Sequence, residues 1–574
     1  MKIMKTENSI QFEKPSKRVQ IHLTDGRTLS GPRGGTLLQF LQPIMEEDGV
    51  QIVGAIVNGR LRELTKSIES ESQVAPVRMD TPDGMRIYRR SLTLLLEAAF
   101  EELFPGAEIY IDHSVSFGGY FCQVKGWDNL SQSDISKLKE RMQEFVNADI
   151  PIEKQVTPLS DALSFFKEHG HQDKVALLKH RKKDYLVLYF INEHRDYHQG
   201  YMVPSTGYLK WFDLEPIEGG FTLRFPRRHL PDAIQPLGDY PKLLDTFRRY
   251  GNWLELLGIE SVGALNDAIE EGRIQEVVLV SEALHEQRIA DLARQIADHR
   301  EEIKLVLIAG PSSSGKTTTS RRLSIQLLAS GVQPFPLEMD RFFVDRKHTP
   351  RDENGELDFE HIEAIDLDRF NHDLQKLIAA EKVQLPHFDF ISGNSTDGEA
   401  VQLKPGQIII VEGIHGLNPS LVTDIPDDQV FRIYISAMTQ LNLDRHNRVS
   451  TTDTRMIRRI VRDARTRGYS AQETIARWES VRRGEKRYIF PYQENADVMF
   501  NSALVYELSA LKRLAEPLLR QVPFGMPEHI EVKRLLALLE WFLPQPTDYI
   551  PDNSILREFI GGSILHDFRL WRNG

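Results

Sequence analysis

Cysteine is almost absent from this chain of 574 residues, with Cys122 as its single example. No internal disulfide can form, which fits a reducing compartment. Long apolar runs are also missing, since the longest, such as 185–191, fall far below the ~18 residues that a membrane helix needs. The N-terminal stretch MKIMKTENSIQFEKPSK alternates charges without an apolar core, unlike a secretory signal. We therefore expect a soluble, cytoplasmic protein.

The chain also lacks an excess of positive charge. Its net charge of −12 argues against broad, nonspecific binding of nucleic acid, although it leaves room for a local basic face. We find no internal repeat and no low-complexity tract. The composition is that of an ordinary globular protein, 41% hydrophobic and 27% charged, and the chain is long enough for about four domains.

The N-terminal half predicts small units of mixed helix and strand. Alternating residues at 19–23 precede the turn Asp25-Gly26, and a helix near 37–45 is followed by a strand at 52–57. Further helices are expected at 91–103, 132–147 and 161–169, with a strand at 185–191. The proline-rich stretch 226–239 indicates a boundary, and helical segments follow it at 240–299.

The stretch GPSSSGKT at 310–317 fits the phosphate-binding loop pattern G-x-x-x-x-G-K-[ST]. An apolar strand pattern precedes it, and leucines at helical spacing follow it. In this setting backbone N–H groups wrap the phosphates, Lys316 reaches the β- and γ-phosphates, and the Thr317 hydroxyl ligates Mg²⁺. The loop therefore predicts binding of a nucleoside triphosphate. Its predicted binding residues are Gly310, Pro311, Ser312, Ser313, Ser314, Gly315, Lys316, Thr317 and Thr318.

Two acidic residues follow at predicted strand ends. A short strand beginning at Leu337 ends in Asp340, which we expect to orient a hydroxyl and take its proton. Aliphatic residues at 408–411 end in Glu412, typical of a Walker B strand whose carboxylate holds Mg²⁺ directly or through water. Ligands sit at such strand ends in open α/β sheets, so both acids are expected beside the phosphate loop.

Four arginines, Arg455, Arg458, Arg459 and Arg462, follow the spacing i, i+3, i+4, i+7 and share one helical face. Asp463 is the only acid at i+4 from any of them, so we expect them to repel one another unless an anion lies among them. A lid closing over a triphosphate would meet that anion and neutralise charge during transfer. The alternative is a solvated basic face.

Two further segments, DFEHIEAID at 358–366 and LPHFDFISG at 385–393, mix acids with aromatics. Such residues suit a site that grips a sugar and stacks a base, and the alternative is a packed aromatic cluster with solvated acids. The predicted substrate-binding residues are Phe343, Glu360, Phe388 and Asp389.

VQIHLTDGRTLSGPRGGTLLQFL and GAIVNGRLREL resemble the TGS domain, the β-grasp module that opens threonyl-tRNA synthetases. YRRSLTLLLEAAFEELFPGAEIYID and DYHQGYMVPSTGYLKWFDL resemble the synthetase's additional domain, whose editing site uses H-x-x-x-H and C-x-x-x-H pairs. This chain has Arg90 and Leu94 at the first pair and His198 and Met202 at the second, so we expect a scaffold without editing chemistry. Only His198 could serve as a base, and the alternative is a structural histidine.

The motifs GPSSSGKTT, MDRFF, DFEHIEAID, PHFDFISG, IIIVEGI, DTRMIRRIVRDARTRG and YIFPYQENADV are similar, in this order, to the uridine kinase/phosphoribulokinase family. The resemblance implies that Asp340 is the general base for a ribose 5′-hydroxyl and that Lys316, Thr317 and Glu412 handle ATP and Mg²⁺. It makes Arg455, Arg458 and Arg459 lid arginines. We expect Arg455 and Arg458 to be catalytic and Arg459 and Arg462 to bind ATP.

Two positions depart from the uridine kinase pattern. Glu360 stands where uridine kinases carry Asp, and Gly393 where they carry a base-contacting His. Loss of a hydrogen-bonding group relaxes discrimination between substrates, so a purine nucleoside or a bare sugar stays open beside uridine.

Together the resemblances imply an α/β P-loop kinase domain with a parallel sheet, preceded by a β-grasp module and an α+β domain. The expected boundaries are 1–80, 81–228, 229–299 (a helical linker), 300–515 and 516–574. We expect an ATP- and Mg²⁺-dependent nucleoside kinase, homo-oligomeric, whose N-terminal half could contact RNA. The alternatives are an RNA-associated ATP-binding regulator and a sugar or sugar-phosphate kinase.

Overall fold

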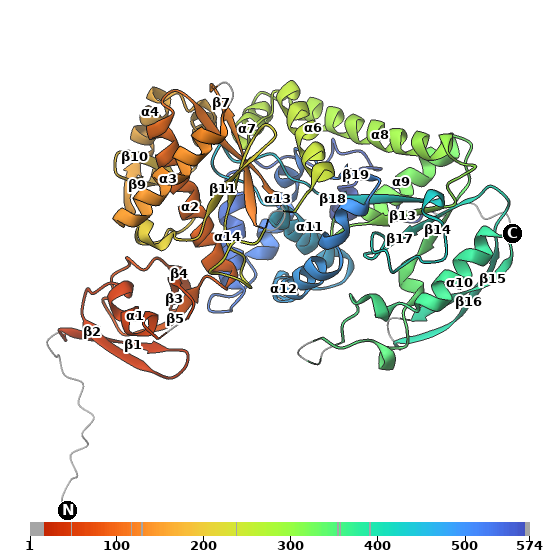
Figure 1. The fold of residues 1–574 in the computed structure, drawn as a ribbon, viewed down its shortest axis with the longest axis horizontal. Coiled ribbons are helices and arrows are strands. Elements are labelled where there is room, and N and C mark those ends of the chain that lie inside the picture. Colours follow the sequence, from red (N-terminus) through yellow and green to blue (C-terminus); the bar gives the residue numbers. More distant parts are fainter. Residues whose placement is uncertain are drawn as a thin grey trace, which may run out of the picture.

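The computed structural model describes residues 16–568 except 48, 116–117, 128–129, 237, 353–354, 356 and 390–391. Most of the N-terminal stretch considered above for a secretory signal lies outside the described residues. The chain forms a small module at one end, a second unit beside it, and a larger unit built on a parallel sheet (Figure 1).

The first module is a five-stranded sheet with one helix. Its order is β2-β1-β5-β3-β4, with β1 parallel to β5 and the other neighbours antiparallel. A capping box between Thr36 and Gln39 starts the helix, whose Leu37 and Phe40 are buried. This is the expected β-grasp arrangement. Its elements are β1 (Arg18–Leu23), β2 (Thr28–Pro32), α1 (Leu37–Met45), β3 (Ile52–Val57), β4 (Arg60–Arg62) and β5 (Ser72–Arg78).

The second unit has the expected α+β character. Helix α2 packs against both of its sheets, which have the orders β11-β12-β7-β6 and β10-β9-β8. Its elements are α2 (Pro82–Leu103), β6 (Glu108–Val115), β7 (Gly119–Lys125), α3 (Gln132–Ala148), β8 (Glu153–Pro158), α4 (Leu159–Glu168), α5 (Gln172–Lys179), β9 (Tyr185–Ile191), β10 (His194–Tyr197), η1 (Thr206–Tyr208), β11 (Asp213–Ile217) and β12 (Gly220–Arg224).

The helix expected at 91–103 begins nine residues earlier, at Pro82. Thr81 accepts a hydrogen bond from the Gly84 N–H, and Pro82 fits the first helical position. The added turns carry Arg86, Arg89 and Arg90, so their charges conceal the apolar periodicity on which the prediction depended.

The segment predicted to link the two halves is helical, and it is packed on its neighbours. It contains α6 (Pro241–Leu257), α7 (Val262–Glu270) and α8 (Ile274–Asp298). Helix α6 packs against β19, α7 against α5, and α8 along α9. One apolar core extends through this segment, from Phe166 of the second unit to Phe559 near the C-terminus.

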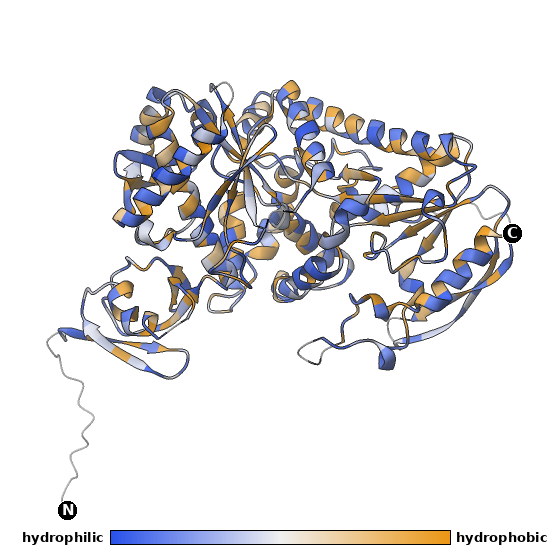
Figure 2. Cartoon of the chain, in the orientation of Figure 1, coloured by the Kyte–Doolittle hydropathy of each residue, from blue (hydrophilic) through white to orange (hydrophobic). Residues whose placement is uncertain are grey.

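The larger unit is built on five parallel strands in the order β14-β17-β13-β18-β19. Residues of the inner strand β13 are all buried, and the strands of this sheet are mostly hydrophobic (Figure 2). The sheet and its connections comprise β13 (Leu305–Ala309), α9 (Lys316–Ala329), β14 (Pro334–Glu338), η2 (Met339–Phe342), η3 (Arg346–His348), η4 (Ile362–Ala364), α10 (Leu367–Ile378), β17 (Ile408–Glu412), η5 (Asp427–Gln429), β18 (Val430–Ser436), η6 (Phe490–Asn495) and β19 (Val498–Asn501).

A two-stranded hairpin, β15 (Lys382–Asp389) and β16 (Asn394–Gln402), extends from this unit beside α10 (Figure 1). The remaining helices are α11 (Thr451–Thr466), α12 (Ala471–Tyr488), α13 (Glu507–Leu519), α14 (His529–Leu539) and α15 (Arg557–Ile560). None of the helices in the described ranges is long and apolar enough to cross a membrane.

Candidate active site

The predicted phosphate loop connects β13 to α9, as expected from the sequence. Gly315 has a φ of 86°, in the left-handed region that favours glycine. At Gly310 a Cβ would lie only 2.0 Å from the Ile435 carbonyl oxygen, so no larger residue fits without movement. The two glycines of the motif are therefore required by the turn itself.

Lys316 begins α9 and folds back over the loop. Its ammonium group donates to the carbonyl oxygens of Gly310 at 2.9 Å and Pro311 at 3.2 Å. Burial lowers the pKa of Lys316, and the nearby Glu412 and Glu558 oppose that shift. The charge is thus held at the mouth of the loop, where the motif predicts contact with phosphate oxygens.

The two predicted metal ligands lie in direct contact. Thr317 donates its hydroxyl to the Glu412 carboxylate at 2.6 Å. Burial raises the pKa of Glu412 to about 7, although Lys316 and the Thr317 hydrogen bond oppose the shift. A hydroxyl and a carboxylate are hard oxygen ligands of the kind that Mg²⁺ prefers, so the pair fits that ion.

Asp340 lies two residues beyond the end of β14, in the 3₁₀ turn η2, and not in the strand that the sequence predicted. Its side chain is exposed. Loss of hydration beside the surrounding protein raises the pKa of Asp340. Lys316 opposes the shift, and Glu338 adds to it. Asp340 also contributes to the raised pKa of Glu412. In the pairing of β14 with β17, Glu338 lies opposite Glu412, so Asp340, two residues further on, is at the same edge of the sheet as Glu412 and the start of α9.

The arginine face of α11 differs from the expectation, because carboxylates from other helices meet its charges. Arg455 pairs with Glu485 of α12, and Arg458 pairs with Glu507 of α13 at 2.5 Å. Arg459 and Arg462 share Asp463, at 3.2 and 2.9 Å. The anions that offset the charges of Arg455 and Arg458 are thus carboxylates of the protein itself, which local spacing does not reveal because they are distant in sequence.

Helix α11 packs against α12, α13 and α15, so it forms a fixed wall of the site in this structure. Arg455 donates to the Ser312 carbonyl oxygen at 2.8 Å, and Arg459 donates to the Ser312 hydroxyl at 2.8 Å. Arg458 is fully buried and donates to the Ser502 carbonyl oxygen at 2.8 Å. Ser502 in turn donates to the Ser314 carbonyl oxygen. The arginines thus support the phosphate loop from behind.

Phe343 connects the two predicted substrate segments, since its ring centroid lies 6.1 Å from that of Phe359, the neighbour of Glu360. Phe343 and Phe388 also pack together with ring centroids 5.5 Å apart, and Phe388 is buried. Glu360 packs over Gly484 of α12, where a Cβ would overlap its carboxylate. Burial, together with Glu485 and Asp358, raises the pKa of Glu360 to about 7.

Asp389 ends β15, next to residues outside the described set. Glu360 contacts Gly484, whose neighbour Glu485 accepts from the Ser312 N–H of the phosphate loop.

Sequence reasoning missed the carboxylates and the C-terminal residues that complete this site. Glu485 accepts from the Ser312 N–H at 3.0 Å, and Glu558 accepts from the Thr318 hydroxyl at 2.8 Å. Ile555 lies against Gly315, where a Cβ would come within 2.6 Å of its side chain. No local pattern distinguishes these residues from other acids and aliphatics in the chain.

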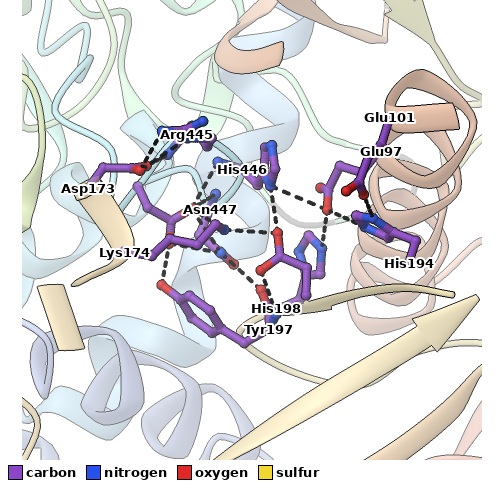
Figure 3. Close-up of polar contacts among 12 residues, drawn as sticks. Glu97, Glu101, Asp173, Lys174, His194, Tyr197, His198, Arg445, His446 and Asn447 are labelled. Atoms are coloured by element: carbon purple, nitrogen blue, oxygen red, sulfur yellow. Dashed lines mark hydrogen bonds and ion pairs between the residues drawn. The ribbon is translucent and has the colours of Figure 1, made fainter. Parts of the chain in front are cut away.

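At the four positions of the synthetase editing motif the N-terminal half is packed. Leu94 and Met202 are buried in the core, and Arg90 donates to the Tyr201 carbonyl oxygen at 2.9 Å. His198 is buried with its Nε2 3.3 Å from Glu97 (Figure 3). No open catalytic constellation forms from these four side chains.

A buried polar joint surrounds His198 and connects it to the larger unit (Figure 3). His446 Nδ1 lies 2.6 Å from Asp196 and 3.3 Å from Glu97, while Lys174 lies 2.9 Å from Asp196 and 3.2 Å from Asp444. Glu97, Asp196 and His198 are close enough to hold a metal ion. Because Lys174 and the histidines already meet these carboxylates, the group fits a structural joint better than a cation site.

Comparison with known proteins separates the two halves. Residues 305–509 match the family described as Phosphoribulokinase / Uridine kinase family. The C-terminal part is thus a kinase-family domain with a P-loop fold.

The N-terminal half matches threonine–tRNA ligases. That of Marinobacter nauticus is 29% identical over 197 residues, which are 33% of this chain and 31% of the ligase. That of Halorhodospira halophila is 28% identical over 202 residues, which are 35% of this chain and 31% of the ligase. The chain therefore spans about a third of the length of these relatives.

Two solved structures show a partial likeness to this chain. A putative fructose transport system kinase from Silicibacter is 20% identical, with a TM-score of 0.27, covering 37% of this chain and 98% of that one. A possible uridine kinase from Bacillus stearothermophilus is 20% identical, with a TM-score of 0.26, covering 37% of this chain and 97% of that one.

Proposed function

We propose that the C-terminal domain is an ATP- and Mg²⁺-dependent kinase that phosphorylates the 5′-hydroxyl of a nucleoside. One observation carries the proposal: Lys316, the Thr317–Glu412 pair and Asp340 lie at one edge of the parallel sheet, because β14 and β17 end side by side there. This set provides a phosphate-binding cation, oxygen ligands for a metal and a carboxylate for the acceptor, which are the parts that phosphoryl transfer requires.

In the proposed reaction Asp340 accepts the proton of the acceptor hydroxyl. The acceptor oxygen bonds to the γ-phosphorus, the bond to the β–γ bridging oxygen breaks, and ADP leaves with that electron pair. Lys316 binds the oxygens of the transferring group and offsets their charge. Thr317 and Glu412 would hold Mg²⁺, which neutralises phosphate charge when bound. Arg455 and Arg459 keep the Ser312 turn in place, since both contact it.

Replacing Lys316 by Ala should weaken ATP binding by at least about tenfold, because a charge-assisted contact to phosphate contributes about 1.5–3 kcal/mol. Isothermal titration of the protein with ATP measures the effect. Lys404→Ala removes the same charge from an exposed loop residue and should bind as the parent does. Equal ATP affinities for the Lys316→Ala protein and the parent would remove Lys316 from the proposed site.

Mg²⁺-dependent ATP binding should strengthen as the pH rises towards 7 and then level off. A metal ligand must be ionised, and Glu412 has its pKa raised to about 7, so it is mostly protonated at pH 6. Below pH 7 we expect a gain of up to about tenfold per pH unit. Protonation of ATP itself also affects binding. Comparison with Glu412→Gln separates the two effects, because that variant should lack the part of the pH dependence that comes from Glu412. Identical pH profiles for the two proteins would contradict the assignment.

The geometry at Gly393 bears on the identity of the acceptor, and it supports a sugar kinase as the second candidate. Gly393 has a φ of 74°, and a Cβ there would lie 2.7 Å from Arg346. A base-contacting histidine would therefore be strained in this turn. A mass-spectrometric screen of uridine, cytidine, inosine, adenosine and pentoses, each with Mg²⁺ and ATP, separates the candidates. Phosphorylation of pentoses alone would replace the nucleoside assignment.

For the N-terminal half we propose a regulatory or localising role, which includes contact with RNA. Its support is the sequence similarity to threonine–tRNA ligases. Co-purification of RNA, together with ATP hydrolysis but no phosphorylated small molecule, would favour an RNA-associated ATP-binding regulator.

A further inference from the structure

A basic cleft lies where the N-terminal half meets the kinase domain. Its volume is about 550 Å³, within the range of small-molecule sites. Helix α2 contributes one wall, and the start of α11 together with the second half of α12 contributes another. The polar joint of Figure 3 borders it through His198, His446 and Asn447.

The cleft concentrates positive charge in a protein of net charge −12. Nine arginines and one lysine line it, against two carboxylates, those of Asp453 and Glu479. Several of these cations are paired; Arg86 and Arg534, for example, both contact Glu531. The local charge nevertheless exceeds what the lining carboxylates can neutralise.

Three of these arginines form no ion pair with a carboxylate among the residues that the structure describes. Arg89 donates to the Met85 carbonyl oxygen at 3.2 Å, and Arg90 donates only to that of Tyr201. Arg448 donates to the Asp112 carbonyl oxygen at 3.0 Å and the Ser114 hydroxyl at 2.9 Å. These contacts orient the guanidinium groups without neutralising them.

The same arginines also repel neighbouring cations. Burial lowers the pKa of Arg90 to about 10, and Arg86 and Arg534 add to the shift. Burial lowers the pKa of Arg448, Tyr120 and Asp112 oppose that shift, and Arg89 adds to it. An unpaired, partly buried cluster of like charges costs free energy, and an anion bound among them would offset that cost.

The rest of the lining suits a planar ring. Phe225, Tyr434 and Trp478 reach the cleft, and Met438 and Leu243 add apolar surface. A nucleotide needs both kinds of group: arginines bind its phosphates, and aromatic side chains stack on its base.

The cleft is separate from the phosphate loop but connected to it. None of the loop residues 310–318 lines the cleft. Arg455 lines it and donates to the Ser312 carbonyl oxygen of the loop at 2.8 Å. A ligand in the cleft would therefore contact α2 of the N-terminal half and a side chain that supports the kinase site.

We propose that this cleft is a second nucleotide site, in which Arg89, Arg90 and Arg448 bind the phosphates of a nucleoside phosphate between the two halves of the chain. The site is independent of the proposed acceptor. Its occupant is a small nucleotide, and an RNA strand is the competing occupant that the experiment excludes or establishes.

Equilibrium dialysis of the full chain against ATP and against UTP, each with Mg²⁺, tests the proposal. With the nucleotide that occupies both sites, the parent protein should bind two equivalents per chain, and Lys316→Ala should retain one of them. Arg89→Gln/Arg448→Gln should lower affinity for the retained equivalent by about tenfold or more, since two charge-assisted contacts are lost. When Arg89→Gln/Arg448→Gln is made in the protein that keeps Lys316, nucleotide binding at the phosphate loop should stay intact. That binding also shows that the double variant folds. Arg294→Gln, on the exposed face of α8, is the matched control.

One bound equivalent in the parent, abolished by Lys316→Ala and unaffected by Arg89→Gln/Arg448→Gln, would overturn the second site. Displacement by a single-stranded RNA oligomer but not by either nucleotide would overturn the small-molecule assignment. Inorganic tripolyphosphate should bind the Lys316→Ala protein at least about tenfold more weakly than the nucleotide, because the aromatic wall adds stacking. Equal affinity would overturn the role of that wall.

Discussion

Asp340→Ala should lower kcat by about 10²–10⁴-fold while ATP binding stays close to that of the parent, because a positioned general base contributes acceleration of that size. Asp340 is exposed at the sheet edge and has no hydrogen bond to the phosphate loop among the described contacts, so its loss should not disturb the triphosphate site. A coupled assay of ADP release gives kcat, and titration with ATP gives the affinity.

Asp340→Asn retains the shape of the side chain but cannot accept the proton, so its kcat should fall about as far as that of Asp340→Ala. Asp368→Asn, at an exposed position in the first turn of α10, is the control and should turn over at the parental rate. If Asp340→Asn kept the parental kcat, another group would have to remove the proton, and the proposed mechanism would be wrong.

Arg458→Met should destabilise the protein by about 3–5 kcal/mol, since removing one member of a buried ion pair leaves the other charge uncompensated. The Arg458 side chain is 0% exposed and that of Glu507 is 3% exposed. Arg458 also supports the Ser502 carbonyl oxygen, and Ser502 contacts the phosphate loop, so ATP affinity should fall with stability. Chemical denaturation followed by circular dichroism measures the unfolding free energy.

The double substitution Arg458→Met/Glu507→Met should recover much of that loss, because a well-packed apolar pair often matches a buried ion pair in stability. Arg294→Ala breaks an exposed pair with Asp291 and should change stability by at most about 1 kcal/mol. A loss below about 1 kcal/mol for Arg458→Met would mean that Glu507 finds another partner, and the ion pair would not be a support of the loop.

Local patterns were sufficient for the parts of the site that are contiguous in sequence. The phosphate loop follows a buried strand and begins a helix, because glycine backbone freedom and helix polarity act over a few residues. The ends of α1 and β9 coincide with those predicted, since their apolar periodicity is clear. The contact between Thr317 and Glu412 also agrees with the rule for parallel strand ends.

Local patterns were insufficient wherever a partner comes from a distant part of the chain. From the sequence, the arginines of α11 were expected to need a bound anion, because their partners Glu485 and Glu507 lie on other helices. The predicted start of α2 is late because three arginines interrupt its apolar pattern, and two of them, Arg89 and Arg90, line the cleft with no ion pair to any residue that the structure describes. Tertiary contacts thus account for the charge of α11, whereas the charge of α2 faces the cleft.

Ile555 and Glu558 contact the turn at Gly315 and Thr318, although Glu558 lies 240 residues after Thr318 in the chain. This brace forms only when residues 555–558 have folded against the start of α9. A variant cut before Ile555 would therefore have an unbraced triphosphate turn, and we expect it to bind ATP more weakly than the full chain.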